Sequence, residues 1–180
     1  MMFQTTGAPR PGAMIDAGIG KTHIIGIAEL KVVRAPDKLS TLGLGSCVGL
    51  VLYDSVTKIG GMVHIMLPQA PPNGEGLNRA KYADTAIPEL IRQLAAAGAQ
   101  PRRLTAKLAG GAHMFSTAKH IDFLNVGDRN VEQCKRSLAA HAIPILAEDT
   151  GGENGRSIEF CCETGVLQVR TVSPRNTRLL

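Results

Sequence analysis

Two apolar runs joined by a short polar link constrain this chain more than any other part of its sequence. The runs are residues 47–54, "CVGLVLYD", and residues 58–68, "KIGGMVHIMLP", and together they predict a β-hairpin. If the link "DSVT" (residues 54–57) forms a four-residue loop, a common hairpin length, Cys47 falls directly opposite His64. Directly opposed residues have Cβ atoms about 4.5–5.5 Å apart, so this register predicts that the thiol and the imidazole meet.

The same register gives the hairpin an apolar face on its other side. The pairs on that face are Val48 with Val63, Leu50 with Gly61 and Leu52 with Ile59. A continuous core face supports the register independently of any chemistry at the other face.

A cysteine beside a histidine is an arrangement that nucleophilic catalysis uses. A free cysteine has a pKa of about 8.5, and a nearby imidazolium favours its thiolate form. The same histidine can later protonate a leaving amine. Gly43 and Gly45 let the backbone turn sharply before Cys47 and admit a substrate close to the main chain. The backbone N–H groups around Ser46 and Cys47 are candidate oxyanion donors.

Two other interpretations of this segment have to be weighed. A cysteine and a histidine on neighbouring strands also occur by chance, in which case Cys47 is a packing residue. Gly43, Gly45 and Gly49 also form a loose dinucleotide-binding pattern. These glycines lead into a strand, however, whereas a phosphate site needs a strand that leads into a helix N-terminus. We therefore reject nucleotide binding.

The rest of the chain predicts one α/β domain over residues 23–180, with a mixed, mainly antiparallel sheet and at least two helices. Residues 1–22 are rich in Gly, Pro and Thr and predict a flexible N-terminal extension. Further strands are predicted over 23–34, over 103–115 and at the start of 143–156, with a loop over 40–47 and a hairpin over 157–172 that turns at 163–165. One helix is predicted over 78–98, and it either starts near Asp84 or kinks at Pro88. A second helix is predicted from about Asp128, with Val131, Cys134 and Leu138 on its core face.

Composition excludes several classes of protein. The net charge of +5 is modest and its basic residues lack interleaved aromatics, which argues against nucleic-acid binding. The apolar stretches are too short to cross a bilayer, and the N-terminus lacks the pattern of an export signal. The four cysteines, at 47, 134, 161 and 162, show no CxxC spacing, so we expect a reduced cytoplasmic protein with neither a metal site nor a cofactor.

Several blocks of the sequence, in order, resemble the chemoreceptor glutamine deamidases of bacterial chemotaxis, the CheD family. The blocks are "TLGLGSCVGLVLYD", "GGMVHIMLP", "KYADTAIPELI", "AKLAGGAHMF", "NVGDRN" and "EDTGGENGRSIEF", and they cover about residues 23–172. The resemblance implies a layered α/β sandwich like the catalytic domain of the cytotoxic-necrotizing-factor toxins. It also implies a Cys-His-Thr site, whose members match Cys47, His64 and Thr41.

The implied reaction is hydrolysis of glutamine side chains on chemoreceptors to glutamate, with release of ammonia through a thioester on Cys47. Thr41 would orient His64, and this role rests on the resemblance alone. The family also implies hydrolysis of receptor glutamyl methyl esters and binding of a CheC-type phosphatase. A non-catalytic adaptor that binds receptor or CheC is the alternative. A papain-like protease fits less well, because a strand rather than a helix follows Cys47.

The remaining polar residues have simpler interpretations. We expect His113 to be structural, and His23, His120 and His141 to lie on the surface or in loops. Asp149 and Glu148 are placed to pair with Arg156 or to shape the following turn. Cys161 and Cys162 alternate along a strand, so one of them is expected to be buried and the other to lie on the opposite side.

Overall fold

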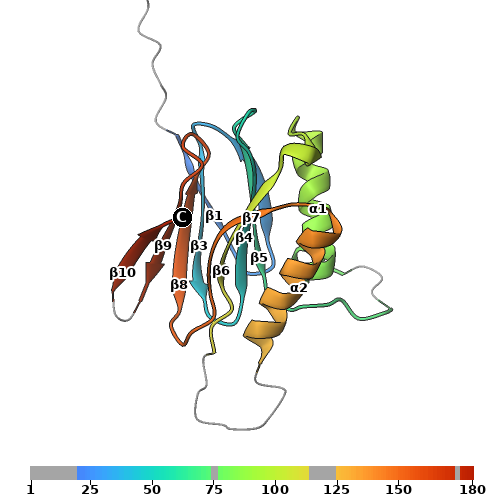
Figure 1. The fold of residues 1–180 in the computed structure, drawn as a ribbon, viewed down its shortest axis with the longest axis vertical. Helices are drawn as coiled ribbons and strands as arrows, with labels where there is room; N and C mark the ends of the chain where they lie inside the picture. Colours follow the sequence, from blue (N-terminus) through green and yellow to red (C-terminus); the bar gives the residue numbers. More distant parts are fainter. Residues whose placement is uncertain (1–19, 74–76, 114–124, 173–174) are drawn as a thin grey trace, which may run out of the picture.

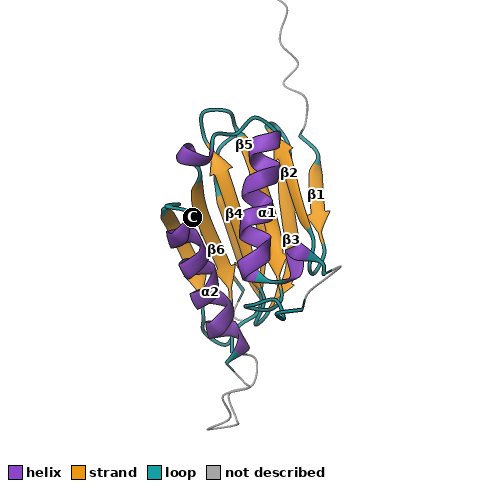
Figure 2. Ribbon diagram, turned by 90° about the vertical axis from the view of Figure 1, so that its right-hand side faces the viewer, coloured by secondary structure: helices purple, strands orange, loops and turns teal. Residues whose placement is uncertain are grey.

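The computed structural model describes residues 20–73, 77–113, 125–172 and 175–180, and it has three layers. Figure 1 shows two β-sheets packed face to face, with both α-helices on the free side of one of them. The sheet in the middle of the molecule, which the helices cover, is called the central sheet. The second sheet is called the outer sheet. Figure 2 shows α1 and α2 lying across the face of the central sheet.

Each sheet has five strands, mostly antiparallel. The outer sheet has the order β1 (Thr22–Ile25), β3 (Lys38–Leu44), β8 (Arg156–Cys161), β9 (Leu167–Thr171) and β10 (Asn176–Leu179). The central sheet has the order β2 (Leu30–Arg34), β5 (Ile59–Ile65), β4 (Val48–Asp54), β6 (Thr105–Gly110) and β7 (Ile145–Thr150). The helices are α1 (Ala83–Ala96) and α2 (Val126–Ala140), with short 3₁₀ turns η1 (Arg79–Lys81) and η2 (Pro101–Arg103). Two pairings, β1 with β3 and β6 with β7, are parallel, so the expected α/β class with mixed, mainly antiparallel pairing is confirmed.

Strand β4 is buried on both faces because it lies in the middle of the central layer. Its even-numbered residues pack beneath the helices, as the sequence predicts for Val48, Leu50 and Leu52. Its odd-numbered residues face the outer sheet, where Val51 joins a second core cluster that includes Phe160. This double burial explains why residues 47–54 read as a nearly continuous apolar run.

The register predicted for the β4–β5 hairpin is wrong by two residues. Asp54 stays in the strand and pairs with Ile59, so Gly49, rather than Cys47, lies opposite His64. The loop still has four residues, but it begins one position later and ends at Lys58, whose φ is +52°. Asp54 extends the strand because its buried carboxylate accepts hydrogen bonds from the loop N–H of Val56 and from the Arg103 side chain.

Two other expectations are also wrong. Residues 23–34 form two strands, β1 and β2, which belong to different sheets, with Ala28 at φ +58° in the turn between them. Residues 40–47 are not all loop, because β3 continues to Leu44 through an irregular step after Thr41. That step holds Gly43 at φ +72°, where the positive φ favours glycine.

The other expected elements agree with the structure. Helix α1 starts at Ala83, close to the expected start near Asp84, and Pro88 lies inside it. The C-terminal hairpin turns where predicted, between β8 and β9, and Cys162 is buried while Cys161 is half-buried. Cys134 is fully buried on α2, as expected. The sequence did not predict β10. The expected extension up to residue 19, His120, and the end of the strand predicted over 103–115 lie outside the described residues.

Candidate active site

A buried hydrogen bond between the two sheets defines the candidate site. Thr41 on β3 and His64 on β5 face each other across the sandwich, with 2.8 Å between Thr41 Oγ1 and His64 Nδ1. Both side chains are completely buried. His64 lies near the end of β5 and Gly49 is its cross-strand partner, so the site is at the end of the hairpin opposite the Ser55–Lys58 loop.

The second contact of Thr41 determines which nitrogen of His64 carries the proton. Thr41 Oγ1 donates its single proton to the carbonyl of Ile25, at 2.7 Å, and a carbonyl can only accept. Thr41 Oγ1 must therefore accept from His64 Nδ1–H. In the neutral imidazole, Nε2 then carries the free lone pair. Within the described part of the chain, this buried Nε2 has no hydrogen-bond partner.

Cys47 lies in the short connection between β3 and β4 and is half-buried. It precedes Gly49, the partner of His64, by two residues, and its side chain packs against the core cluster between the sheets, on the face that His64 occupies. Cys47 is thus a diagonal neighbour of His64 instead of its direct partner. Diagonal neighbours are about 7–8 Å apart at the backbone and closer at their side chains.

Burial favours the neutral forms of both groups. It lowers the pKa of His64 below the ordinary histidine value and raises the pKa of the Cys47 thiol above the ordinary cysteine value. Both shifts favour a resting thiol beside a neutral imidazole whose Nε2 has a free lone pair. This arrangement differs from the thiolate–imidazolium pair that the sequence suggested.

Hydrogen bonds to three successive backbone carbonyls hold the connection that carries Cys47 in place. The carbonyls belong to residues 45–47, and each accepts one hydrogen bond: Gly45 O from Ala112 N at 2.8 Å, Ser46 O from Asn130 Nδ2 at 2.9 Å, and Cys47 O from Gly111 N at 2.8 Å. Gly110 makes this close approach possible, because a Cβ at that position would lie 2.2 Å from Cys47 O. The connection is thus fixed from outside along its whole length.

The expected oxyanion donors differ in their availability. Among the described residues, the N–H groups of Ser46 and Cys47 donate to no acceptor. The N–H of Gly45 is used, because it donates to Gly43 O at 3.0 Å. Gly43 itself is exposed at the irregular step in β3. Within the described ranges, the amides of Ser46 and Cys47 are therefore available as oxyanion donors, and that of Gly45 is not.

Asn130 is the site residue that sequence reasoning missed. It lies on α2, is completely buried, and donates both to Ser46 O and to Met66 O, at 2.9 and 3.0 Å. It therefore connects the segment before Cys47 with the segment after His64. A signal was present: Asn130 is four residues before Cys134, so a polar residue occupies the helix face that the sequence assigned to the core.

The other polar side chains singled out from the sequence make polar contacts outside this pair of strands. His113 Nε2 lies 2.7 Å from Asp128 Oδ2, and His23 Nε2 lies 2.7 Å from Asp37 Oδ2. Arg156 donates to Asp149, as the sequence suggested, and Arg178 also contacts this carboxylate. Glu148 pairs instead with Lys135. His141 contacts the carbonyl of Ser137 at the end of α2.

Two features are absent from the described residues. No group of three or more His, Cys, Asp or Glu side chains is placed there to hold a metal ion. No helix within the same ranges has the length and apolar character needed to cross a membrane.

The fold and the site together define an α/β sandwich protein with a candidate cysteine–histidine centre, and comparison with known proteins identifies its family. Residues 66–171 match the family described as CheD chemotactic sensory transduction. A chemoreceptor glutamine deamidase CheD of Halalkalibacterium halodurans is 55% identical over 149 residues, which are 82% of this chain and 92% of that protein. A probable chemoreceptor glutamine deamidase CheD of Caldanaerobacter subterraneus is 51% identical over 148 residues, 82% of this chain and 91% of its own. The CheD of Bacillus velezensis is 48% identical over 156 residues, 86% and 94% of the two chains.

The chain belongs to the CheD family. The family match covers more than half of the sequence, and these relatives align over most of their own length. The resemblance noted from the sequence blocks is therefore confirmed.

Proposed function

We propose that this protein is a chemoreceptor glutamine deamidase, which hydrolyses specific receptor glutamines to glutamate and releases ammonia. The observation that carries the proposal is the Ile25–Thr41–His64 chain of hydrogen bonds, which leaves Nε2 of His64 as a base on the sheet face that holds Cys47. The printed names of the relatives, chemoreceptor glutamine deamidases, support the same activity.

In the first half of the reaction, Cys47 acts as the nucleophile. Its thiol proton moves to His64 Nε2 as the sulfur attacks the carbon of the glutamine side-chain amide. The carbonyl oxygen becomes an oxyanion, for which the free N–H groups of Ser46 and Cys47 are the donors. The C–N bond then breaks, His64 returns the proton to the departing nitrogen, and ammonia leaves a thioester on Cys47.

In the second half, water replaces ammonia. His64, neutral again, takes a proton from water, and the resulting hydroxide attacks the thioester carbon. The C–S bond breaks, the sulfur recovers the proton from His64, and the product is a glutamate side chain. A methyl ester of glutamate would follow the same path with methanol as the leaving group.

In the neutral resting pair, His64 removes the thiol proton only when a substrate is bound for the sulfur to attack. A permanent thiolate would be exposed to oxidants and to other electrophiles. Substrate binding covers the half-buried thiol, and the proton transfer then accompanies attack. Thr41 takes no proton in this scheme, because its hydroxyl hydrogen is committed to Ile25. Its role is to hold the imidazole in the reactive tautomer.

The proposed substrate also suggests where the protein acts and what binds it. The substrates are the cytoplasmic regions of chemoreceptors, so we place the protein in the cytoplasm. A CheC-type phosphatase is the proposed protein partner, and it would compete with receptor for the same face of the sandwich.

The experiment is mass spectrometry of a chemoreceptor cytoplasmic fragment from the same organism, incubated with the wild-type protein or with Cys47→Ala. We expect specific glutamines to gain the mass of a deamidation only with the wild type. Cys161→Ala is a matched control, because it removes another half-buried thiol, on β8, and should leave the conversion intact. If neither the wild type nor Cys47→Ala converts glutamine and both bind the fragment equally, the protein is a non-catalytic adaptor.

A further inference from the structure

Each free amide near Cys47 belongs to a peptide group whose carbonyl is held. A trans peptide is planar, and its C=O and N–H point in opposite directions. The carbonyl of Ser46 and the N–H of Cys47 are the two ends of one such group. Whatever fixes the direction of Ser46 C=O therefore also fixes the direction of Cys47 N–H.

Asn130 is the group that fixes this peptide. Its Nδ2 donates to Ser46 O at 2.9 Å, which turns the Cys47 N–H away from α2. The neighbouring peptide is held in the same way, since Ala112 N donates to Gly45 O and the Ser46 N–H points oppositely. The Ala112 contact is made by a backbone N–H and therefore does not depend on a side chain. Asn130 holds its peptide through a side chain, so a substitution at this position can remove the contact.

The environment of Asn130 leaves its carboxamide one orientation. Both of its contacts, Ser46 O and Met66 O, are carbonyl oxygens, which can only accept, so Nδ2 must face them. Its Oδ1 is buried and accepts from no group among the described residues. Leaving a buried carbonyl oxygen unsatisfied lowers stability. Asn130 nevertheless holds two carbonyls, from the segments on either side of the site.

We propose that Asn130 is a positioning residue that preorganises the amide of Cys47 to bind the oxyanion of the reaction. This inference rests on the proposed acyl-transfer function and adds a residue to it. Asn130 does not touch the reacting atoms: it acts through the Ser46–Cys47 peptide. Loss of its two donors leaves that peptide free to rotate, and the Cys47 N–H is then no longer fixed before the oxyanion forms.

The test compares two reactions of the same sulfur. Acylation of Cys47 by p-nitrophenyl acetate forms a tetrahedral oxyanion and releases p-nitrophenolate. Alkylation of Cys47 by iodoacetamide displaces iodide at an sp³ carbon and forms no oxyanion. Both products are quantified on the Cys47 peptide by mass spectrometry, which separates this site from the other three cysteines. Neither reagent requires a receptor, so the assay is independent of the natural substrate.

The variants are Asn130→Ala and Asn130→Asp. The aspartate keeps the size of the side chain but replaces both donors, so it separates lost hydrogen bonds from lost packing. We expect acylation of Cys47 to fall about 100-fold in both variants, which is the loss typical of one oxyanion donor. At each pH between 6 and 9, the alkylation rate of each variant should differ from that of the wild type by less than about threefold. Ser137→Ala, a buried polar change on the same helix, is the control and should alter neither rate.

Two results would overturn the inference. One is acylation at the wild-type rate in Asn130→Asp. The other is an equal loss of acylation and alkylation, which would mean that Asn130 acts on the thiol or on the fold in general. Failure of the wild type to deamidate receptor glutamine, with the acylation difference intact, would count against the proposed substrate and leave the role of Asn130 standing.

Discussion

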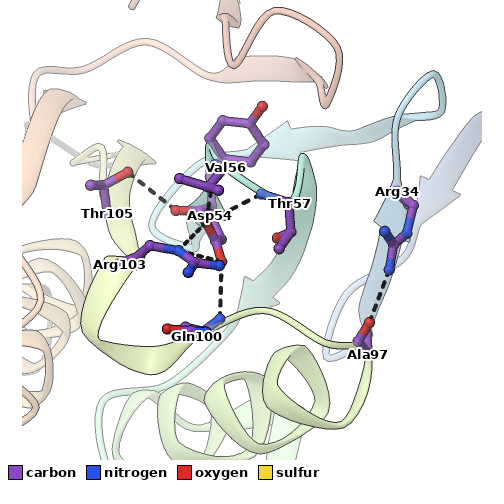
Figure 3. A network of polar contacts seen from close by, with 9 residues as sticks. Arg34, Asp54, Val56, Thr57, Ala97, Gln100, Arg103 and Thr105 are labelled. Carbon is purple, nitrogen blue, oxygen red and sulfur yellow. Dashed lines mark hydrogen bonds and ion pairs between the residues drawn. The ribbon is translucent and has the colours of Figure 1, made fainter.

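Two buried polar clusters lie at opposite ends of the β4–β5 hairpin, and they differ in how the ionisable group at their centre is hydrogen-bonded. At the loop end, the Asp54 carboxylate accepts from the Arg103 guanidinium, from Gln100 N at 2.9 Å and from the loop N–H of Val56, as Figure 3 shows. At the other end, His64 Nε2 and Asn130 Oδ1 have no partner in the described chain.

The difference separates a structural cluster from a reactive one. Arg103 and the backbone donors hold the pKa of Asp54 far below the ordinary aspartate value, so its charge is permanent near neutral pH. Burial lowers the pKa of His64, which favours the neutral ring. The Asp54 carboxylate has little left to offer a substrate, although the buried Thr57 hydroxyl in the same loop has no partner among the described residues. The unpartnered buried nitrogen of His64 is available for a substrate.

The largest effect should come from removing the base. We expect His64→Gln to lower the deamidation kcat by about 10⁴-fold, because His64 Nε2 is the base that the mechanism uses to accept the Cys47 proton. The glutamine amide can still donate to Thr41, so the free energy of unfolding should change by less than about 1 kcal/mol. Receptor-fragment turnover and urea denaturation measure the two quantities. A loss of several kcal/mol would mean that His64 is chiefly structural.

The opposite pattern is expected at the loop end. Asp54→Asn removes the charge that Arg103 and the loop amides share, and we expect the free energy of unfolding to fall by about 3 kcal/mol. Activity per folded molecule should stay unchanged, since the two clusters lie at opposite ends of the hairpin. The pH dependence sharpens this prediction.

The depressed pKa of Asp54 means that its stabilisation is complete above the unfolded aspartate value of about 3.9 and is lost as the pH falls below it. Urea denaturation at pH 5 and pH 3 should therefore show the wild type losing more stability than Asp54→Asn over this interval. Equal losses would place the acid sensitivity of the fold elsewhere.

A smaller effect is expected from Thr41→Val, which keeps the volume but removes the hydroxyl. The imidazole loses the acceptor that selects its Nδ1–H tautomer, and kcat should fall about tenfold with little change in KM. Steady-state kinetics on the receptor fragment test this. Ser40→Ala is the control, because the Ser40 hydroxyl, on the neighbouring residue of β3, bonds to Ile158 O and not to His64.

The smallest effect concerns the resting state of the thiol. Because burial raises the pKa of Cys47, its alkylation rate should continue to rise above about pH 8.5, the ordinary cysteine value. A stable thiolate–imidazolium pair would instead give a rate that is constant from about pH 6 upward. Iodoacetamide kinetics between pH 5 and 10 distinguish the two, and a plateau would contradict the neutral pair.

The sequence located the candidate site better than it described its geometry. Alternation along two strands was enough to put Cys47 and His64 on one face, and a loop shifted by one residue moves the register by two and leaves that face unchanged. The actual register depends on Asp54, whose buried partners come from a distant segment. No local pattern contains that information.

The remaining parts of the site depend on contacts between layers. Thr41 and His64 belong to different sheets, and the sequence pattern did not reveal that two sheets exist. Residues 23–34 look like one strand because β-propensity is local, whereas the crossing between sheets at Ala28 is set by packing. Family resemblance supplied Thr41. Asn130 was overlooked because the stripe on α2 was interpreted only for its apolar residues.

The hydrogen bond from Thr41 to Ile25 makes the position of the proton on His64 depend on an edge strand. Strand β1 has four residues and a single neighbour, β3. If β1 separates locally, the Thr41 hydroxyl loses its carbonyl and is free to turn its hydrogen toward Nδ1. The imidazole then carries its proton on Nε2, where it blocks transfer from Cys47. In the proposed mechanism, fraying of this short edge would act as a reversible off-state, and it would also expose Ile25, which belongs to the core between the sheets.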